Sequence, residues 1–156
     1  NFSFFNWNDF DYQLWNNLKK EAQKKIKYHP IDIYGSDLIQ QNIDLCLDSS
    51  MKLSISKYLN FKKADFKTIK SKYNKGTIII NPPYGHRIGE MLKLKKLYSD
   101  IGDHLKKNFS GFEAYLFTGN LELLKSIGLR TKSKTILKNG KIDCRLAYYP
   151  LKSGKY

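Results

Sequence analysis

The sequence lacks the features typical of a membrane, secreted or metal-binding protein. No apolar run approaches the roughly 20 residues that span a bilayer, and no signal-peptide pattern opens the chain. Cysteine is scarce: Cys46 and Cys144 lie far apart and outside any CxxC pattern, so we expect two buried free thiols. His29 and His104 have no partner at the spacing of metal ligands. These absences favour a cytoplasmic globular protein with no membrane partner and no metal.

Acidic residues are also few, and the charge is strongly one-sided. Of 156 residues, 28 are Lys or Arg and 14 are Asp or Glu, which gives a net charge of +14. Such a surface attracts phosphate backbones without reading their sequence. Only Arg87, Arg130 and Arg145 are arginine, so a generally lysine-rich, solvated surface is the alternative. The charge therefore favours a polyanionic partner without establishing one.

Helical and strand patterns alternate along the chain. Apolar residues recur at helical spacing in four segments: 8–27, 38–47, 90–107 and 121–127. Strand-like patterns mark six: 31–36, 58–63, 76–80, 112–117, 135–138 and 141–149. Asn8 or Asp9 can cap the first helix, and Asn139-Gly140 predicts a hairpin turn between the last two strands. This order predicts an α/β fold: a mostly parallel sheet with helices on both faces, ending in an antiparallel hairpin.

Polar residues follow three of the predicted strands. Asp37, Asp65 and Asn81 each stand at the carboxyl end of a strand, where α/β sheets bind their ligands. We therefore expect the three side chains to share one edge of the sheet. The strand before Asn81, residues 76–80, is apolar and mostly β-branched, which predicts burial on both faces.

The segment that follows this strand, Asn81-Pro82-Pro83-Tyr84, carries groups suited to holding an amine. The two prolines stiffen the turn, because each fixes its own φ and lacks a donor. The Asn81 side chain and the Pro82 carbonyl then offer two acceptors that match the two N–H donors of an exocyclic base amine. Tyr84 is able to stack on the base. The alternative is a strand-to-loop turn with an Asn cap and a packing tyrosine.

Asn81-Pro82-Pro83-Tyr84 resembles the fourth motif of methyltransferases that act on base amino groups. Its extension to Glu90 is similar to the NPPYGER-type motif of the bacterial large-subunit ribosomal RNA guanine methyltransferases, although His86 stands where that family has Glu. Full chains of that family carry an RNA-binding THUMP domain upstream. The resemblance also covers the segments 4–7 and 34–37 and the late Asn139-Gly140 with Cys144.

The resemblance implies an enzyme with a Rossmann-like class I methyltransferase sheet. It implies methyl transfer from S-adenosyl-L-methionine to the exocyclic amino group of guanine in 23S ribosomal RNA. The implied catalytic residues are Asn81, Pro82, Pro83 and Tyr84, and those binding the cofactor are Asp37, Asp65, Phe66 and Asn81.

Specific roles follow for the cofactor residues. Asp37 would hold the ribose hydroxyls, Asp65 the adenine amino group, and Phe66 would donate its backbone N–H. A helix cap at Asp37 and a turn residue at Asp65 are the alternatives. His86, Arg87 and Lys95 are weaker candidates for RNA phosphate contacts, with ordinary solvation as the alternative.

One part of the family pattern is missing. Before Ile31 no strand is followed by the Gly-rich loop that holds the methionine part of the cofactor. We therefore expect residues 1–156 to be a partial catalytic domain that lacks the first strand and this loop. The strand, the loop and the THUMP domain are expected upstream. A DNA adenine methyltransferase and a non-catalytic RNA-binding remnant of the fold remain as alternatives.

Overall fold

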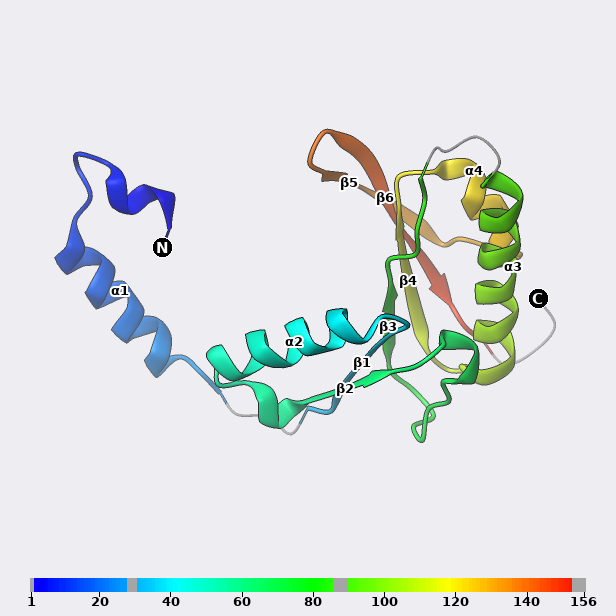
Figure 1. Ribbon diagram of the computed structural model, residues 1–156, viewed down its shortest axis with the longest axis horizontal. Coiled ribbons are helices and arrows are strands. Elements are labelled where there is room, and N and C mark those ends of the chain that lie inside the picture. Colours follow the sequence, from blue (N-terminus) through cyan, green and yellow to red (C-terminus); the bar gives the residue numbers. More distant parts are fainter. Residues whose placement is uncertain (1, 28–30, 86–89, 153–156) are drawn as a thin grey trace.

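The computed structural model describes residues 2–27, 31–85 and 90–152 (Figure 1). Within these ranges it has four α-helices, namely α1 (Tyr12–Lys24), α2 (Gln40–Lys52), α3 (Met91–Asn108) and α4 (Leu121–Leu124). Its strands are β1 (Ile33–Asp37), β2 (Leu59–Lys63), β3 (Thr77–Ile80), β4 (Glu113–Thr118), β5 (Ser133–Asn139) and β6 (Ile142–Pro150). The predicted alternation of strands and helices and the final hairpin are confirmed. No helix in these ranges has the length and apolar character needed to cross a membrane.

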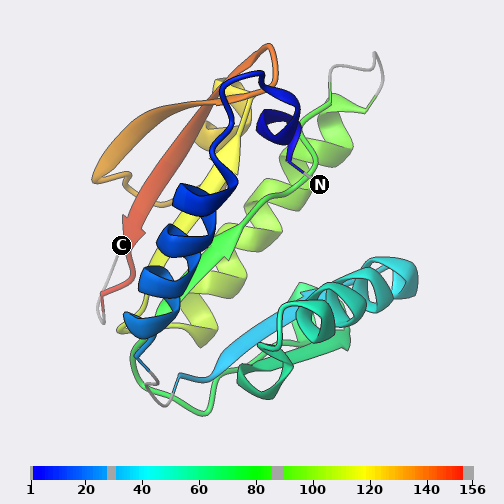
Figure 2. The ribbon, with the colours of Figure 1, turned by 90° about the vertical axis from the view of Figure 1, so that its left-hand side faces the viewer.

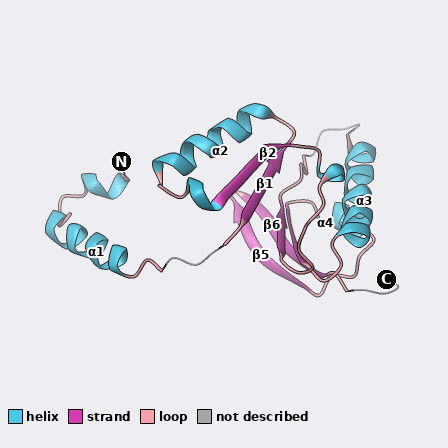
Figure 3. Cartoon of the chain, turned by 90° about the horizontal axis from the view of Figure 1, so that it is seen from below, coloured by secondary structure: helices cyan, strands magenta, loops and turns pink. Residues whose placement is uncertain are grey.

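The strands are divided between two sheets. β1 and β2 pair in parallel, and α2 packs along them (Figure 3). The second sheet has the order β3-β4-β6-β5, in which β3 and β4 are parallel while β6 is antiparallel to both β4 and β5. β1 and β3 are not hydrogen-bonded neighbours, and Figure 2 shows the β1–β2 pair set apart from the four-stranded sheet.

The core lies between α3 and one face of the four-stranded sheet. Leu94, Tyr98, Ile101 and Leu105 of α3 are buried, as their helical spacing predicts. They pack against apolar residues of β4, β6, α4 and the turn after α4, among them Ala114, Leu116, Leu123, Ile127, Ala147 and Tyr149. This packing fixes the orientation of β4, whose carboxyl end borders the candidate site.

Gly102 sets how closely α3 approaches the turn after α4. A Cβ built at Gly102 would lie 1.7 Å from the carbonyl oxygen of Ile127, a distance no side chain tolerates. Glycine is therefore required here by the close approach of two backbones.

Burial differs from the prediction at two apolar positions. The predicted burial of residues 76–80 on both faces is wrong, because Ile79 is 74% exposed while Ile78 and Ile80 pack on the core. An apolar run reveals that a strand is suited to burial, but it does not reveal what covers each face. Of the two thiols expected to be buried, Cys144 is buried and Cys46 is exposed.

Local polar contacts also correct the predicted first helix. Asp11, rather than Asn8 or Asp9, caps α1: its side chain accepts from the backbone N–H groups of Gln13 and Leu14. No residue of α1 is buried.

The hairpin turn is shifted by one residue from its predicted place. Asn139 pairs with Ile142, which leaves Gly140 and Lys141 as the two-residue loop. Gly140 has a φ of +59°, which only glycine adopts without strain at the first position of such a loop. Asn139 is consequently the last residue of β5, and its side chain is free to reach outside the turn.

Candidate functional site

The carboxyl ends of β1 and β2 lie side by side and bring two predicted residues together. Asp37 ends β1 and lies opposite Lys63 in the parallel register. The N–H of Ala64 donates to the carbonyl oxygen of Asp37 at 2.9 Å. Asp65 follows immediately, so both carboxylates stand at one edge of this sheet, where α/β proteins bind ligands.

Asp37 is already engaged by its own chain. One carboxylate oxygen accepts from the Ile39 N–H at 2.7 Å and the other accepts from the Asn42 side chain at 3.1 Å. These bonds, the Ile39 bond foremost, hold the pKa of Asp37 below its ordinary value. The capping alternative is wrong, because α2 begins at Gln40 with Ile39 as its N-cap and no side-chain cap; Asp37 instead closes a turn before the helix, and both of its oxygens keep further acceptor capacity.

Asp65 and Phe66 form a fixed turn beside it. Asp65 accepts from the Lys67 N–H at 2.9 Å and opens a short 3-10 helix, Phe66–Thr68, so the turn alternative is also present. The Phe66 ring is half-buried and meets the ring of His104 edge-on, with centroids 5.7 Å apart. His104 is held in turn by the carbonyl oxygen of Ile69, 2.8 Å from Nε2.

The Asn-Pro-Pro-Tyr segment leaves the end of β3. Asn81 and Pro83 are exposed, Pro82 is buried and Tyr84 is half-buried. The buried proline anchors the turn, while the exposed Asn81 side chain is accessible to a ligand. The structure therefore brings Asp37 and Asp65 together on one sheet and places Asn81 on the other, since β4 is the one partner of β3 among the described strands.

The Tyr84 ring is anchored by the hairpin of β5 and β6. The side-chain amide of Asn139 donates to the Tyr84 hydroxyl at 2.8 Å, and the Cys144 thiol lies 3.9 Å from the same oxygen. The ring also meets that of Phe117 edge-on. Sequence reasoning treated Asn139 as a turn residue and missed this contact, because a pair 55 residues apart leaves no local pattern.

A buried pair of hydroxyl groups joins α3 to the carboxyl end of β4. The Tyr98 and Thr118 hydroxyls lie 2.9 Å apart, and Thr118 accepts from the Asn120 N–H at 3.1 Å. Burial raises the pKa of Tyr98 to about 12. Asn120 caps α4 by accepting from the N–H groups of Glu122 and Leu123.

Of the candidate RNA contacts, only Lys95 lies among the described residues; His86 and Arg87 lie outside them. Lys95 forms an ion pair with Glu122 at 2.7 Å. This bond lowers the pKa of Glu122 below its ordinary value. Lys95 would have to exchange this partner for a phosphate in order to contact RNA.

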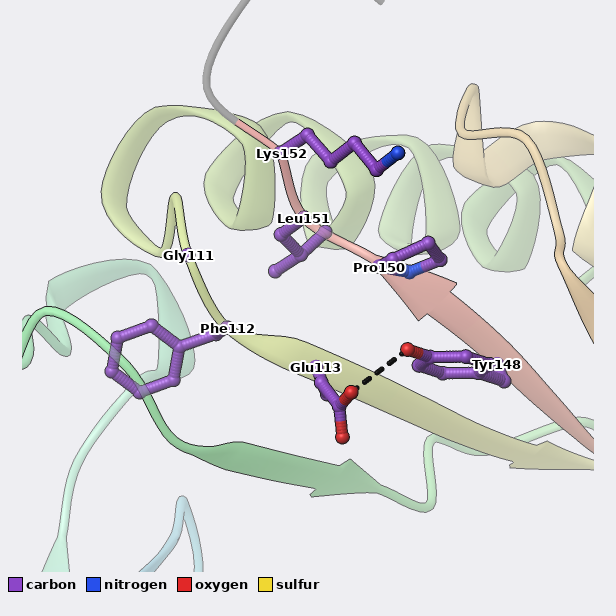
Figure 4. A pocket seen from close by; sticks show the side chains of 7 residues that line it. All are labelled: Gly111, Phe112, Glu113, Tyr148, Pro150, Leu151 and Lys152. Carbon is purple, nitrogen blue, oxygen red and sulfur yellow. Dashed lines mark hydrogen bonds between the residues drawn. The ribbon is translucent and has the colours of Figure 1, made fainter.

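A surface hollow lies at the opposite end of β4 (Figure 4). Its lining comes from the start of β4 and the end of β6, and there Tyr148 donates to the Glu113 carboxylate at 2.9 Å. This bond raises the pKa of Tyr148. Because it lies at the amino end of β4, the hollow is not part of the site formed at the carboxyl ends of the strands. Among the described residues, no three His, Cys, Asp or Glu side chains gather as metal ligands.

The fold is that of a class I methyltransferase. A crystal structure titled as a possible methylase from Clostridium difficile 630 superposes with a TM-score of 0.83 at 28% identity, covering 96% of this chain and 40% of that chain. SMU.472, a candidate methyltransferase whose crystal structure contains SAH, gives a TM-score of 0.84 over 99% of this chain and 41% of that one. At 21% identity, the second match shows the fold alone.

Residues 3–148 match the family described as UPF0020, an RMKL-like methyltransferase domain, and the chain belongs to this family. A Synechocystis sp. protein named as a candidate RNA methyltransferase, slr0064, is 35% identical over 96% of this chain and 39% of its own length. A ribosomal RNA large subunit methyltransferase K/L from Shewanella baltica is 30% identical over 96% of this chain and 22% of its own length. The chain therefore spans about two fifths or less of these curated relatives.

Proposed function

We propose that this chain is part of the catalytic domain of an S-adenosyl-L-methionine-dependent methyltransferase. Its substrate would be the exocyclic amino group of guanine in 23S ribosomal RNA. The observation that carries the proposal is the Asn-Pro-Pro-Tyr segment at the carboxyl end of β3, with Asn81 exposed and the Tyr84 ring anchored.

The residues at the ends of β1 and β2 fit the nucleoside part of this cofactor. Asp37 is held as a carboxylate, and a carboxylate oxygen with two lone-pair sites is able to accept from a ribose hydroxyl while keeping its present bond. In the described hydrogen bonds Asp65 uses only one side-chain oxygen, which leaves the other for the adenine amino group. Phe66 lies beside Asp65 with its ring fixed, so its backbone N–H and ring edge complete this half of the site.

The chain's own contribution to the chemistry is positioning. The bound cofactor supplies an electrophilic methyl group on a sulfonium. The Asn81 side-chain oxygen and the Pro82 carbonyl would accept hydrogen bonds from the two amine N–H groups, which would turn the nitrogen lone pair toward that methyl. Transfer to the amine would leave the cofactor's sulfur neutral, and the amine would release one of its protons to solvent. Stacking on Tyr84 holds the base plane during transfer.

Ribosomal RNA as the substrate is supported by charge and by the relatives. The net charge of +14 provides attraction to a phosphate backbone. The Shewanella baltica relative is named for action on ribosomal RNA. His86, Arg87 and Lys95 are proposed as phosphate contacts near the site, with Lys95 released from Glu122 on binding.

The length of the relatives supports a larger catalytic domain. We propose that a further strand and a Gly-rich loop, contributed by sequence upstream of Asn1, complete the cofactor site, with an RNA-binding THUMP domain before them. Calorimetry with S-adenosyl-L-methionine on residues 1–156 and on the longer protein tests this. Equal affinity of the two would contradict it.

Methyl transfer from radiolabelled cofactor to protein-free large-subunit RNA tests the function. The protein that contains this chain is expected to label the RNA, and nuclease digestion should yield N2-methylguanosine. Label in duplex DNA as N6-methyladenine would instead identify a DNA enzyme. RNA binding without cofactor binding or label would identify a non-catalytic module. Asn81→Ala serves as the negative control.

A further inference from the structure

The Tyr84 ring is held from its hydroxyl end by the hairpin of β5 and β6. Asn139 donates to the hydroxyl at 2.8 Å, and the Cys144 thiol lies within 3.9 Å of it. Register places Asn139 opposite Ile142 and Leu137 opposite Cys144. Since side chains alternate along a strand, Asn139, Ile142 and Cys144 share the face of the hairpin that Tyr84 contacts.

The ring edge is confined by the end of β4. A Cβ built at Gly119 would lie 2.9 Å from Tyr84 Cε2 and 2.9 Å from Ile142 Cγ2, so the missing side chain at Gly119 leaves room for both groups. Phe117 meets the ring at 86° with centroids 6.5 Å apart. One edge of Tyr84 therefore packs on β4 and β6 while its hydroxyl is tethered to β5.

This tether depends on the hairpin loop. Gly140 adopts a φ of +59° and closes the chain in two residues, Gly140 and Lys141. The amide of Asn139 is thus released from any role within the loop. Its strand position points it toward the hydroxyl of a residue 55 positions earlier in the chain.

We propose that Asn139 is a positioning residue for methyl transfer: by fixing the Tyr84 hydroxyl it fixes the direction of the ring's long axis, while Phe117 and Gly119 limit the tilt of the ring on which the target base stacks. The inference rests on the proposed function. A stacked base follows the position of the ring, so a ring whose hydroxyl end is free to move would spread the amine over unproductive positions. Asn139 itself does not touch the substrate, and its effect passes entirely through Tyr84.

A double-mutant cycle on the protein that contains this chain tests the inference. Asn139→Ala, Tyr84→Phe and the double variant are compared by kcat and by the KM values for RNA and for S-adenosyl-L-methionine. Each single change is expected to lower kcat by about 5- to 10-fold, the rate equivalent of one hydrogen bond, with the KM for the cofactor unchanged. The double variant should lose no more than either single one, because both changes remove the same contact.

Two further variants separate positioning from folding. Asn139→Asp is expected to restore most of kcat, since a carboxylate accepts from the Tyr84 hydroxyl. Lys138→Ala changes the neighbouring exposed residue, whose ion pair with Asp143 is a loose 3.9 Å, and should leave kcat unchanged. Selective 13C labelling of tyrosine gives a readout independent of activity: the Cζ signal of Tyr84, the carbon that carries the hydroxyl, should shift in Asn139→Ala because the hydrogen bond is lost.

Different results would refute the proposed function and the positioning role of Asn139. A wild-type protein without methyl transfer would refute the proposed function. An active wild type whose kcat is unaffected by Asn139→Ala, or for which the two single effects add, would overturn the positioning role alone. A fall in melting temperature in Asn139→Ala with an unchanged kcat would show that the contact stabilises the fold and has no part in methyl transfer. Should Asn139→Ala fail to fold, the Tyr84→Phe and Asn139→Asp variants still decide the question.

Discussion

The backbone N–H of Ala64 donates to the carbonyl oxygen of Asp37 at 2.9 Å and ties the end of β1 to the end of β2. Because Asp65 follows Ala64, the separation of the two carboxylates is set by the sheet rather than by flexible side chains. A ligand that carries a sugar and a base at fixed separation meets a preorganised pair of acceptors. Such preorganisation lowers the entropic cost of binding.

The charge of Asp37 is expected to contribute directly to cofactor affinity. Asp37→Asn keeps an oxygen for the Ile39 N–H but removes the negative charge that strengthens bonds to ribose hydroxyls. Hydrogen bonds to a charged acceptor are stronger than those to a neutral one, so the Kd for S-adenosyl-L-methionine should rise by about 10-fold. Calorimetry measures it. Asp44→Asn on α2, where Asp44 only accepts from the exposed Gln40, is the matched control, and an equal effect of both changes would refute the role.

Asn81 should be needed for rate and not for folding. Asn81→Ala is expected to lower kcat by about 100-fold, since loss of one amine acceptor allows the target to leave its reactive orientation. The melting temperature should stay the same because the Asn81 side chain is exposed. Asn60→Ala, at an exposed position of β2, provides the control for asparagine loss. Methyl transfer at wild-type rate by Asn81→Ala would exclude this segment from the chemistry.

Gly102→Ala should destabilise the protein, although alanine in place of glycine usually stabilises a helix. Alanine in place of glycine ordinarily stabilises a helix by about 1 kcal/mol. At Gly102 its Cβ would meet the Ile127 carbonyl at 1.7 Å, so Gly102→Ala is expected to lower the free energy of unfolding by about 1–3 kcal/mol or more. Urea denaturation measures the change. Gly85→Ala, whose Cβ meets nothing within 4 Å, should be nearly neutral, and a stabilised Gly102→Ala protein would show that α3 lies further from the turn.

Because the pKa of Tyr98 is raised in the folded protein, we expect the free energy of unfolding to fall at alkaline pH. In the unfolded chain tyrosine ionises near a pKa of about 10, whereas burial raises the pKa of Tyr98 to about 12. Between these values the unfolded state releases a proton that the folded state keeps, so the free energy of unfolding falls as pH rises from about 10 to about 12. Tyr98→Phe should make this fall shallower without abolishing it, since burial also raises the pKa of Tyr149.

The same variant has an effect at neutral pH. Tyr98→Phe loses the bond to Thr118, which should cost about 1 kcal/mol of unfolding free energy at pH 7. Urea denaturation across pH gives both values. Tyr12→Phe, at an exposed tyrosine, is the control and should follow the wild type throughout. An unchanged alkaline slope in Tyr98→Phe would contradict the assignment.

Sequence reasoning located the elements well because their signals are local. The apolar spacing of α3 predicted its buried face, and the abrupt Pro82-Pro83 pair correctly marked the end of β3. It failed where a partner decides the outcome. Burial of Ile79 depends on what covers β3, and an Asn-Gly pair is compatible with two loop registers.

In the candidate site, too, local sequence patterns predicted some features, while contacts between distant segments decided others. Asp37 and Asp65 were predicted to share an edge, and parallel pairing of β1 and β2 confirms that pair. Asn81 follows a strand of the other sheet, so the prediction that all three share the edge of one sheet is wrong among the described strands. The Tyr84–Asn139 bond joins two segments that become neighbours only after β4 and β6 pair, and nothing in either segment alone predicts it.

The exposed Ile79 and the unpaired outer edge of β3 among the described strands have a consequence for colloidal behaviour. An apolar edge strand is a template for association with other copies of itself. The net charge of +14 opposes such contacts at low ionic strength, but salt shortens the range of that repulsion to about 8 Å at physiological strength. Residues 1–156 on their own should therefore stay dispersed in dilute buffer and precipitate on salt addition, which is the reverse of ordinary salting-in.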